Sequence, residues 1–115
     1  MSILHKPVPL EIVCYHCQQS AEKILKAYAI AQGEPLIKTH DLRIIIGQCL
    51  NHEQSFNGLA DACTALNDYS TLTRYPANDD NTTEDDMNAA LKDAAEILEF
   101  TKSKLAELGY EPKAE

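Results

Sequence analysis

Six residues in three short stretches of the sequence have side chains suited to binding a nucleotide or another phosphate-bearing ligand. His16, Gln19 and Lys23 recur at steps of three and four residues, so a helix with about 100° per residue places them in one row. The row carries an imidazole, an amide and an ammonium between aliphatic residues, whereas a solvent-facing row would be mostly charged. This mixture indicates contact with a ligand or a partner, and a half-buried helix between two neighbours is the equal alternative.

The other three residues follow later in the chain. His40 comes one residue after Thr39, a candidate helix N-cap, where free backbone N–H groups can receive a phosphate. Arg74 offers a planar guanidinium that suits phosphate, and the ring of Tyr75 can stack on a base. For Arg74 the alternative is a structural ion pair with a helix C-terminus or an acidic neighbour. These residues predict an anion-binding site, and the sequence shows no nucleophile with an adjacent base.

Two pairs of residues could be written as a four-ligand zinc site. Cys14 and Cys17 form a C-x2-C pair, and Cys49 with His52 forms a C-x2-H pair. These cysteines, however, fall on the apolar stripes of expected helices, whereas zinc knuckles place such pairs on tight turns. We therefore predict reduced core cysteines, with no metal and no cofactor.

The acidic residues between positions 79 and 86 are a weaker candidate for a divalent-cation site. Asp79, Asp80, Glu84, Asp85 and Asp86 lack the spacing of a calcium-binding loop. A solvated connection that caps the following helix accounts for them better.

The net charge argues against broad, sequence-independent binding of nucleic acid. The chain of 115 residues has a formal charge of −8, yet residues 1–57 carry five acidic and five basic side chains. The acidic excess lies in residues 58–115, with thirteen acidic and five basic side chains. Extensive phosphate contact needs many cations, so we expect no DNA binding and at most a small anion pocket in the neutral half.

Helices must position these candidate residues. The first two helices can be predicted from the residues at their ends. Residues 10–31 carry an apolar stripe at helical spacing and begin just after Pro9. Gly33 is a favourable C′ residue that ends this helix. Thr39 is the expected N-cap of the second helix, whose apolar stripe covers residues 42–50.

Two more helices are predicted in the acidic half. Residues 51–58 are expected to be a loop or a frayed turn, followed by a third helix that Pro76 ends. Thr83 with Asp86 resembles a capping box at the start of the fourth helix, which we expect to stop at Gly109.

These elements predict an all-α protein, an antiparallel up-and-down four-helix bundle, because connections of about four to eight residues favour antiparallel neighbours. We expect one domain over residues 1–115, with tails at 1–9 and 110–115. The start shows neither a secretory signal nor a membrane span, so we expect a soluble, cytoplasmic protein. The residues expected in the core are Ile24, Leu25, Ile45, Ile46, Leu66, Leu91 and Leu98.

Three blocks of the sequence resemble the HEPN domain family (higher eukaryotes and prokaryotes nucleotide-binding). The family's signature helix is similar to residues 14–27, CYHCQQSAEKILKA, and the start of its next helix is similar to residues 38–42, KTHDL. Its Arg-Tyr-Pro element matches residues 74–76. The similarity spans roughly residues 10–108, and three motifs in the right order are more specific than any one alone.

The resemblance implies an all-helical bundle, usually homodimeric and often partnered with a small nucleotidyltransferase, and some members are RNA-cleaving toxins. Arg74, Lys23 and His40 fall on the family's three motif blocks. The family usually has another helix before its signature helix, whereas nine residues precede Leu10 here. We therefore expect an apolar seam that a second copy covers.

The catalytic motif of the RNA-cleaving members is missing from this sequence. Those members carry an arginine followed by a histidine after four to six intervening residues. Arg43 precedes His52 by nine positions, about half a helical turn out of phase, and no histidine follows Arg74.

The sequence therefore predicts a non-catalytic module that binds a nucleotide or an RNA phosphate in a cleft of a helical dimer. Its expected partner is a minimal nucleotidyltransferase, in a pair of the toxin–antitoxin kind. Two alternatives stay open: an endoribonuclease toxin with a non-standard active site, and a purely structural dimerisation module.

Overall fold

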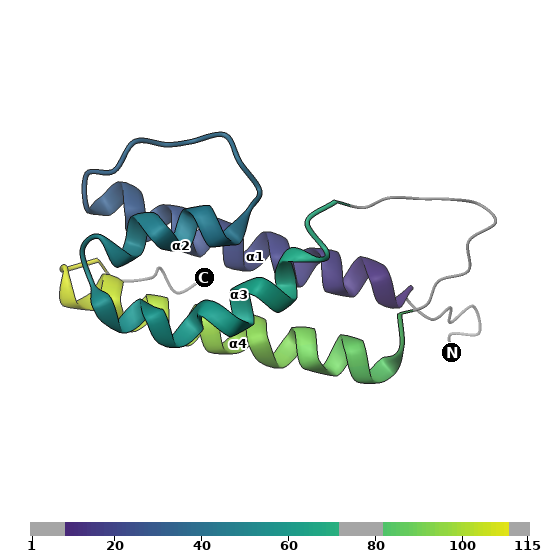
Figure 1. The fold of residues 1–115 in the computed structure, drawn as a ribbon. Coiled ribbons are helices and arrows are strands. Elements are labelled where there is room, and N and C mark those ends of the chain that lie inside the picture. The colour runs from purple at the N-terminus through teal and green to yellow at the C-terminus, as the bar shows by residue number, and fades with distance from the viewer. Residues whose placement is uncertain (1–8, 72–81, 111–115) are drawn as a thin grey trace, which may run out of the picture.

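All regular elements among the described residues are helical, which confirms the predicted all-α class (Figure 1). The computed structural model describes residues 9–71 and 82–110. Its elements are α1 (Leu10–Ala31), α2 (Leu42–Leu50), the 3-10 helix η1 (Gln54–Leu59), α3 (Ala60–Asn67) and α4 (Glu84–Glu107). None of the described helices is both long enough and apolar enough to cross a membrane.

Both long helices begin and end where the sequence indicates. α1 starts after Pro9 and stops before Gly33, whose φ of +91° suits glycine and whose N–H donates to the carbonyl of Ile30. α4 starts with a complete capping box: Thr83 Oγ1 accepts from the Asp86 N–H at 3.1 Å, and the Asp86 carboxylate accepts from the Thr83 N–H at 3.0 Å. Asp86 thus serves as a helix cap, as predicted.

The shorter elements differ from the prediction at their ends. Asp41, not Thr39, is the N-cap of α2, because its carboxylate accepts from the Arg43 N–H at 3.0 Å. Thr39 instead accepts from the Asp41 N–H at 3.1 Å, just before the cap. Residues 54–58, expected as part of a loop or frayed turn, lie in η1, and α3 ends at Asn67.

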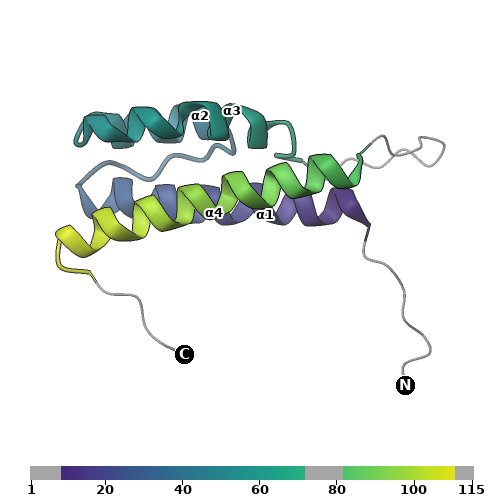
Figure 2. The same cartoon turned by 90° about the horizontal axis from the view of Figure 1, so that it is seen from below.

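The helices form two layers, with α1 beside α4 in one and α2 beside α3 in the other (Figure 2). α3 runs antiparallel to α2 and to α4. Its end contacts the start of α2, since Asn67 accepts from the Leu42 N–H. Glu53, before η1, pairs with Lys104 near the end of α4.

The connection between α1 and α2 departs from the predicted up-and-down alternation. The His40 carbonyl accepts from Gln18 near the middle of α1, while Gln48 reaches Pro35 beyond the end of α1. Residues 32–41 therefore run back along α1, and α2 lies parallel to it. Ten extended residues can span roughly 30 Å, whereas a nine-residue helix is about 14 Å long, so this return path needs no strain.

The core lies between the layers and contains a cluster of three aromatic rings that the sequence analysis did not predict. Phe56 is fully buried, with its ring 4.7 Å from that of Tyr28 and 4.9 Å from that of Phe100. η1 brings Phe56 to this position between the two layers. Burying a side chain of this size contributes roughly 1.5–3 kcal/mol.

Most of the predicted core residues are confirmed. Leu25, Ile45, Ile46 and Leu66 are buried, and Ile24 and Leu98 are half-buried. The prediction is wrong for Leu91, which is 45% exposed. The apolar face of α4 is wider than the surface that α1 and α3 cover, so Leu91 stays at its edge.

Candidate functional site

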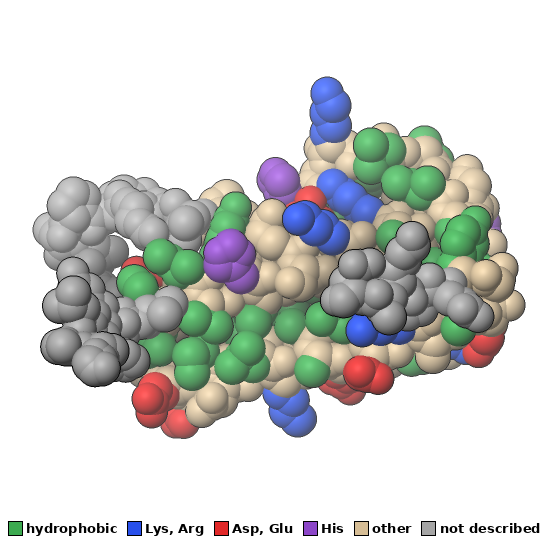
Figure 3. All heavy atoms as spheres, turned by 180° about the vertical axis from the view of Figure 1, so that it is seen from behind, with side chains coloured by type: hydrophobic (Ala, Val, Ile, Leu, Met, Phe, Trp, Pro, Cys, Tyr) green, Lys and Arg blue, Asp and Glu red, His purple; other side chains and the backbone are tan. Residues whose placement is uncertain are grey.

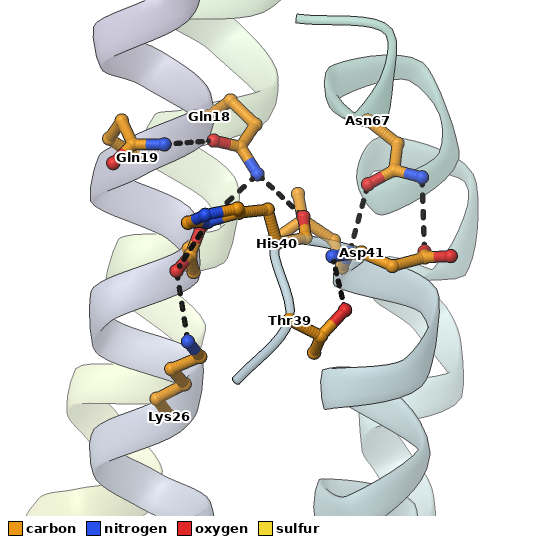
Figure 4. A network of polar contacts seen from close by, with 9 residues as sticks. Gln18, Gln19, Lys26, Thr39, His40, Asp41 and Asn67 are labelled. Atoms are coloured by element: carbon orange, nitrogen blue, oxygen red, sulfur yellow. Dashed lines mark hydrogen bonds and ion pairs between the residues drawn. The ribbon is translucent and has the colours of Figure 1, made fainter. Parts of the chain in front are cut away.

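An exposed histidine is anchored on a buried carboxylate between α1 and the connection that follows it (Figure 4). His40 Nδ1 lies 2.9 Å from Glu22 Oε1 and 3.2 Å from Glu22 Oε2. The side chain of His40 is 64% exposed, whereas that of Glu22 is only 9% exposed. One ring nitrogen is thus held by α1 while the ring itself stays accessible to solvent.

Three further side chains complete a polar network around the Glu22 carboxylate. Gln18, fully buried, donates from Nε2 to the His40 carbonyl at 2.9 Å and to Glu22 Oε1 at 3.5 Å. Gln19 Nε2 donates to Gln18 Oε1 at 2.7 Å, which fixes the orientation of the buried amide. Lys26 Nζ donates to Glu22 Oε2 at 3.0 Å.

The network keeps Glu22 ionised. Burial by itself raises the pKa of this carboxyl, but the hydrogen bonds from His40 and Lys26 outweigh it and hold the pKa below the ordinary value. An ionised carboxylate can only accept hydrogen bonds, so His40 Nδ1 must carry a proton. Nε2 is then the ring nitrogen left for a ligand, as an acceptor when the ring is neutral and as a donor when it is protonated.

The N-cap of α2 holds His40 from the other side. Asn67 accepts from the Leu42 N–H at 2.9 Å and donates to Asp41 Oδ1 at 3.0 Å. Arg43 donates to both oxygens of the same carboxylate at 3.1 Å, and these side-chain bonds lower the pKa of Asp41 to about 2. Residues of α1, α2 and α3 therefore fix the segment that presents His40.

The far end of the connection has a similar arrangement built on a different histidine nitrogen. Glu34 accepts from His52 Nε2 at 2.7 Å, and this hydrogen bond lowers the pKa of Glu34. Gln48 Nε2 donates to the Pro35 carbonyl at 3.1 Å and to Glu34 Oε1 at 3.5 Å. A glutamine, a glutamate and a histidine thus fasten each end of the connection between α1 and α2. His40 bonds to its glutamate through Nδ1, whereas His52 bonds to its glutamate through Nε2.

Two of the predicted site residues, His40 and Gln19, meet in one network through Gln18. His16 and Lys23 lie exposed on the outer face of α1, and Lys23 directly follows the buried carboxylate. Figure 3 shows Lys, Arg and His side chains gathered on one part of this face, around a small acidic area.

The remaining predicted residues are not placed. Arg74 and Tyr75 lie outside the described residues, as do Pro76, Asp79 and Asp80. Their proposed roles in phosphate binding and base stacking therefore stay predictions from the sequence. The prediction that Pro76 ends the third helix is wrong, because α3 already ends at Asn67.

The sequence analysis missed Gln18 and Glu22, although one signal for them exists. Both lie on the buried side of α1, close to Cys14 and Leu25 on the helix surface. A polar side chain inside an apolar stripe indicates an internal hydrogen bond, since buried polar groups are nearly always paired. The partner, His40, is separated from Gln18 by 22 residues, so nothing in the local pattern identified it.

All four cysteines are buried and none forms a disulfide, in agreement with the predicted packing role. Cys49 donates to the Leu25 carbonyl at 3.5 Å, and burial raises the pKa of Cys49 and of Cys63 to about 12. Thiols of this kind are poor nucleophiles and poor metal ligands at neutral pH. Within residues 9–71 and 82–110, no group of three or more His, Cys, Asp and Glu side chains could hold a metal ion.

A shallow apolar groove, here called the α1–α4 groove, runs along the outer side of these two helices. One hollow of about 460 Å³ is lined by Val13, His16, Cys17, Ser20, Leu91, Ala94, Ala95 and Leu98. A second hollow of about 440 Å³ is lined by Ala27, Ile30, Ala31, Leu105 and Tyr110. Apolar side chains are visible along this face (Figure 3), and Ile30, Leu91 and Tyr110 are 48%, 45% and 54% exposed. Because His16 lines the groove, the groove adjoins the polar face of α1.

Comparison with known proteins identifies one family. The family model described as HEPN domain matches residues 3–105, which include α1, α2, η1, α3 and nearly all of α4. No curated protein and no solved structure matches the chain.

Proposed function

This chain belongs to the HEPN domain family, and we propose that it is a non-catalytic module that binds a phosphate group of RNA or of a nucleotide. The proposed site lies on α1 and on the segment just before α2, with His40 and Lys23 as ligand-binding residues. The observation that carries the proposal is the accessible His40 ring, held on a carboxylate that is itself almost fully buried. Membership of the family supports a nucleotide-related or RNA-related role in general.

The geometry favours anion binding for two reasons. A ring that Glu22 already holds through Nδ1 loses little freedom when Nε2 binds a ligand, and such an outer-shell carboxylate is a common way to orient histidine. Lys23 adds an exposed ammonium on the same helix, while the pairing of Lys26 with Glu22 leaves Lys26 less available. The neutral half of the chain also repels an anion less than the acidic half does.

Other predicted residues extend this proposal. Gln19 supports the network from within α1, and His16 lies one turn earlier on the exposed row. Arg74 and Tyr75 remain candidates for a guanidinium contact with phosphate and for stacking on a base.

Binding of a short fluorescein-labelled single-stranded RNA, followed by anisotropy, tests the site. We expect His40→Ala to weaken binding roughly 10- to 100-fold, the value of a charge-assisted hydrogen bond. His52→Ala is the matched control, because it also removes a histidine bonded to a glutamate of this connection. Lys23→Ala should weaken binding, and Lys102→Ala, which removes an exposed ammonium from α4, should not. Equal losses in His40→Ala and His52→Ala would refute the site.

We also propose that a second copy of the chain covers the α1–α4 groove. The groove exposes large apolar side chains that a monomer would leave in water, which marks an interaction surface. The homodimer is proposed to pair with a small nucleotidyltransferase, as in toxin–antitoxin pairs, in the cytoplasm, where buried cysteines stay reduced. The nucleotidyltransferase partner is proposed from the resemblance to the family alone. A chain that dimerises without binding RNA would instead be a structural dimerisation module.

One observation favours the alternative of an endoribonuclease. A histidine oriented by a carboxylate is the arrangement that a general base requires, and His40 with Glu22 has it. RNA cleavage also needs a group that protonates the leaving oxygen. Lys26, the cation of this network, already donates to Glu22. We therefore place phosphate binding first and cleavage second.

A further inference from the structure

We propose that the outer face of α2, together with the connection beside it, docks an acidic amphipathic helix of a protein partner. This surface, here called the α2 face, consists of Leu36, Lys38, Arg43, Ile44 and Gly47. It lies apart from the α1–α4 groove. It also contains neither His40 nor Lys23, so the inference goes beyond the proposed phosphate site and does not rest on it.

The α2 face exposes two large aliphatic side chains. Leu36 is 65% exposed and Ile44 is 51% exposed. Gln48 Nε2 donates to the Pro35 carbonyl at 3.1 Å, which places Leu36 beside the turn of α2 that follows Ile44. The connection borders α2 along one edge of the molecule (Figure 1). These two side chains therefore form an apolar surface of their own, separate from the groove.

A glycine in α2 leaves a notch in this surface. Gly47 lies one turn after Ile44 in the interior of the helix, where glycine is destabilising relative to alanine. A Cβ added to Gly47 would meet no neighbouring atom within 4 Å, so the packing of the described residues does not require a glycine there. The missing side chain lets another helix approach the backbone of α2 closely. The notch beside Ile44 thus suits a large apolar side chain of a partner.

The charges of the α2 face favour an acidic partner. The side chain of Arg43 is 62% exposed, and its Nε and Nη2 donate to Asp41. This pairing fixes the guanidinium and leaves its other N–H groups for a second carboxylate. Lys38 is exposed and has no ion pair among residues 9–71 and 82–110. Because the side chain of Asp41 is only 27% exposed, the accessible charge of this face is mainly positive, in a chain whose net charge is −8.

An amphipathic helix supplies both kinds of contact at once. Its apolar side chain would lie in the notch at Gly47, between Leu36 and Ile44. Side chains three or four residues away on a helix lie on the same side, so Asp or Glu at those positions would reach Lys38 and Arg43. The partner is therefore defined by a large apolar residue with carboxylates one turn away.

A phage-displayed library of helical peptides tests the inference with the whole protein as bait. Peptides of about 16 residues are longer than α2 and can cross it completely. We expect the selected peptides to carry Asp or Glu three or four residues from a large apolar residue. Binding of the synthetic, fluorescein-labelled peptides should weaken at least roughly tenfold in Ile44→Ser and in Lys38→Glu. The matched controls, Leu91→Ser in the groove and Lys102→Glu on α4, should leave this binding unchanged.

Gly47→Ala should change stability and binding in opposite directions. The helix propensity of alanine predicts a melting temperature about 4 °C higher than that of the wild type. The added methyl group fills the notch, so peptide binding should weaken roughly tenfold. Gly58→Ala, at another glycine with open space around its Cβ, should leave peptide binding unchanged. A Gly47→Ala protein that binds the peptides as tightly as the wild type would refute the proposal.

Other results would also overturn the inference. It fails if the library yields no enriched peptide, or only peptides that bind Ile44→Ser and Lys38→Glu as tightly as the wild type. Vesicles of phosphatidylserine and phosphatidylcholine in equal parts that bind the wild type but not Lys38→Glu would identify a lipid surface instead. Self-association that is lost in Ile44→Ser but kept in Leu91→Ser would identify a second copy as the occupant. RNA binding should be the same in the wild type and in Ile44→Ser, so a failure of this inference leaves the proposed function standing.

Discussion

The Nδ1 atom of His40 lies 2.9 Å from Oε1 of Glu22, although 18 residues separate the two in the chain. The contact fastens the start of α2 to the middle of α1 and joins an accessible ring to a buried charge. A group held in this way has few orientations, so a ligand that meets it need not order it first. The stability of this contact and the proposed binding of a ligand therefore depend on the same pair.

Glu22→Gln is expected to lower the free energy of unfolding by roughly 1.5–3 kcal/mol at neutral pH, the net value of a hydrogen bond to a charged group. The effect should depend on pH. The pKa of Glu22 in the folded protein lies below its ordinary value of 4.5, so the carboxylate stabilises the fold above about pH 4.5. This contribution is lost as the pH falls through the folded-state pKa. Urea denaturation at a series of pH values should show the wild type and the variant converging in acid.

Glu34→Gln is the control for this prediction, since Glu34, in the connection, also pairs with a histidine, His52, which follows α2. We expect the same convergence in acid but unchanged RNA binding, because His52 lies at the far end of the connection. A wild type that gains stability over Glu22→Gln as the pH falls would contradict the assignment of Glu22 as an ionised partner.

The sequence allowed the local features of the fold to be predicted and left the long-range ones open. The bounds of α1 and the capping box of Thr83 with Asp86 depend on residues within one or two turns, and both are confirmed. The direction of α2 depends on the path of residues 32–41. That path is fixed by hydrogen bonds such as the one between Gln18 and His40, whose partners no local pattern links.

For the candidate site, too, local features were predicted correctly and long-range contacts were not. Helical spacing correctly placed His16 and Lys23 on an outer face of α1, because that inference needs only the period of the helix. The expectation that Leu91 is buried failed for the opposite reason. An apolar stripe shows which residues avoid water but not whether a neighbouring helix or a second copy covers them.

Leu91→Lys is expected to weaken the proposed homodimer at least roughly tenfold while leaving the monomer folded. Covering an unpaired ammonium in an apolar groove costs more than about 1.4 kcal/mol, which corresponds to that factor, and the exposed position tolerates the change in the monomer. Sedimentation equilibrium measures the dissociation constant. Leu36→Lys, at a 65% exposed leucine that does not line the groove, should leave the dimer intact. A wild type that is monomeric at tens of micromolar, an order typical of weak dimers, would rule out the dimer.

We expect the purified protein not to cleave RNA in the absence of metal ions. Acid–base cleavage requires one group to take the proton of the 2′-hydroxyl and another to protonate the leaving oxygen. The family's arginine–histidine motif is missing from the sequence, and Lys26 is paired with Glu22. Incubation with labelled RNA and chelator, followed by gel analysis, tests this expectation. Cleavage that disappears in His40→Ala but persists in His52→Ala would overturn it and identify His40 as a general base.

Arg74→Ala separates a binding role from a structural one at a position that the structure does not place. The sequence has only two arginines, and Arg43 is engaged with Asp41, so Arg74 is the guanidinium left for a phosphate. If it binds phosphate, the variant should bind RNA more weakly by roughly 1.5–3 kcal/mol, with an unchanged melting temperature. If it serves instead in an ion pair with a helix end, the melting temperature should fall while binding stays the same. Measuring both quantities on this variant distinguishes the roles, and a variant that only melts earlier would remove Arg74 from the site.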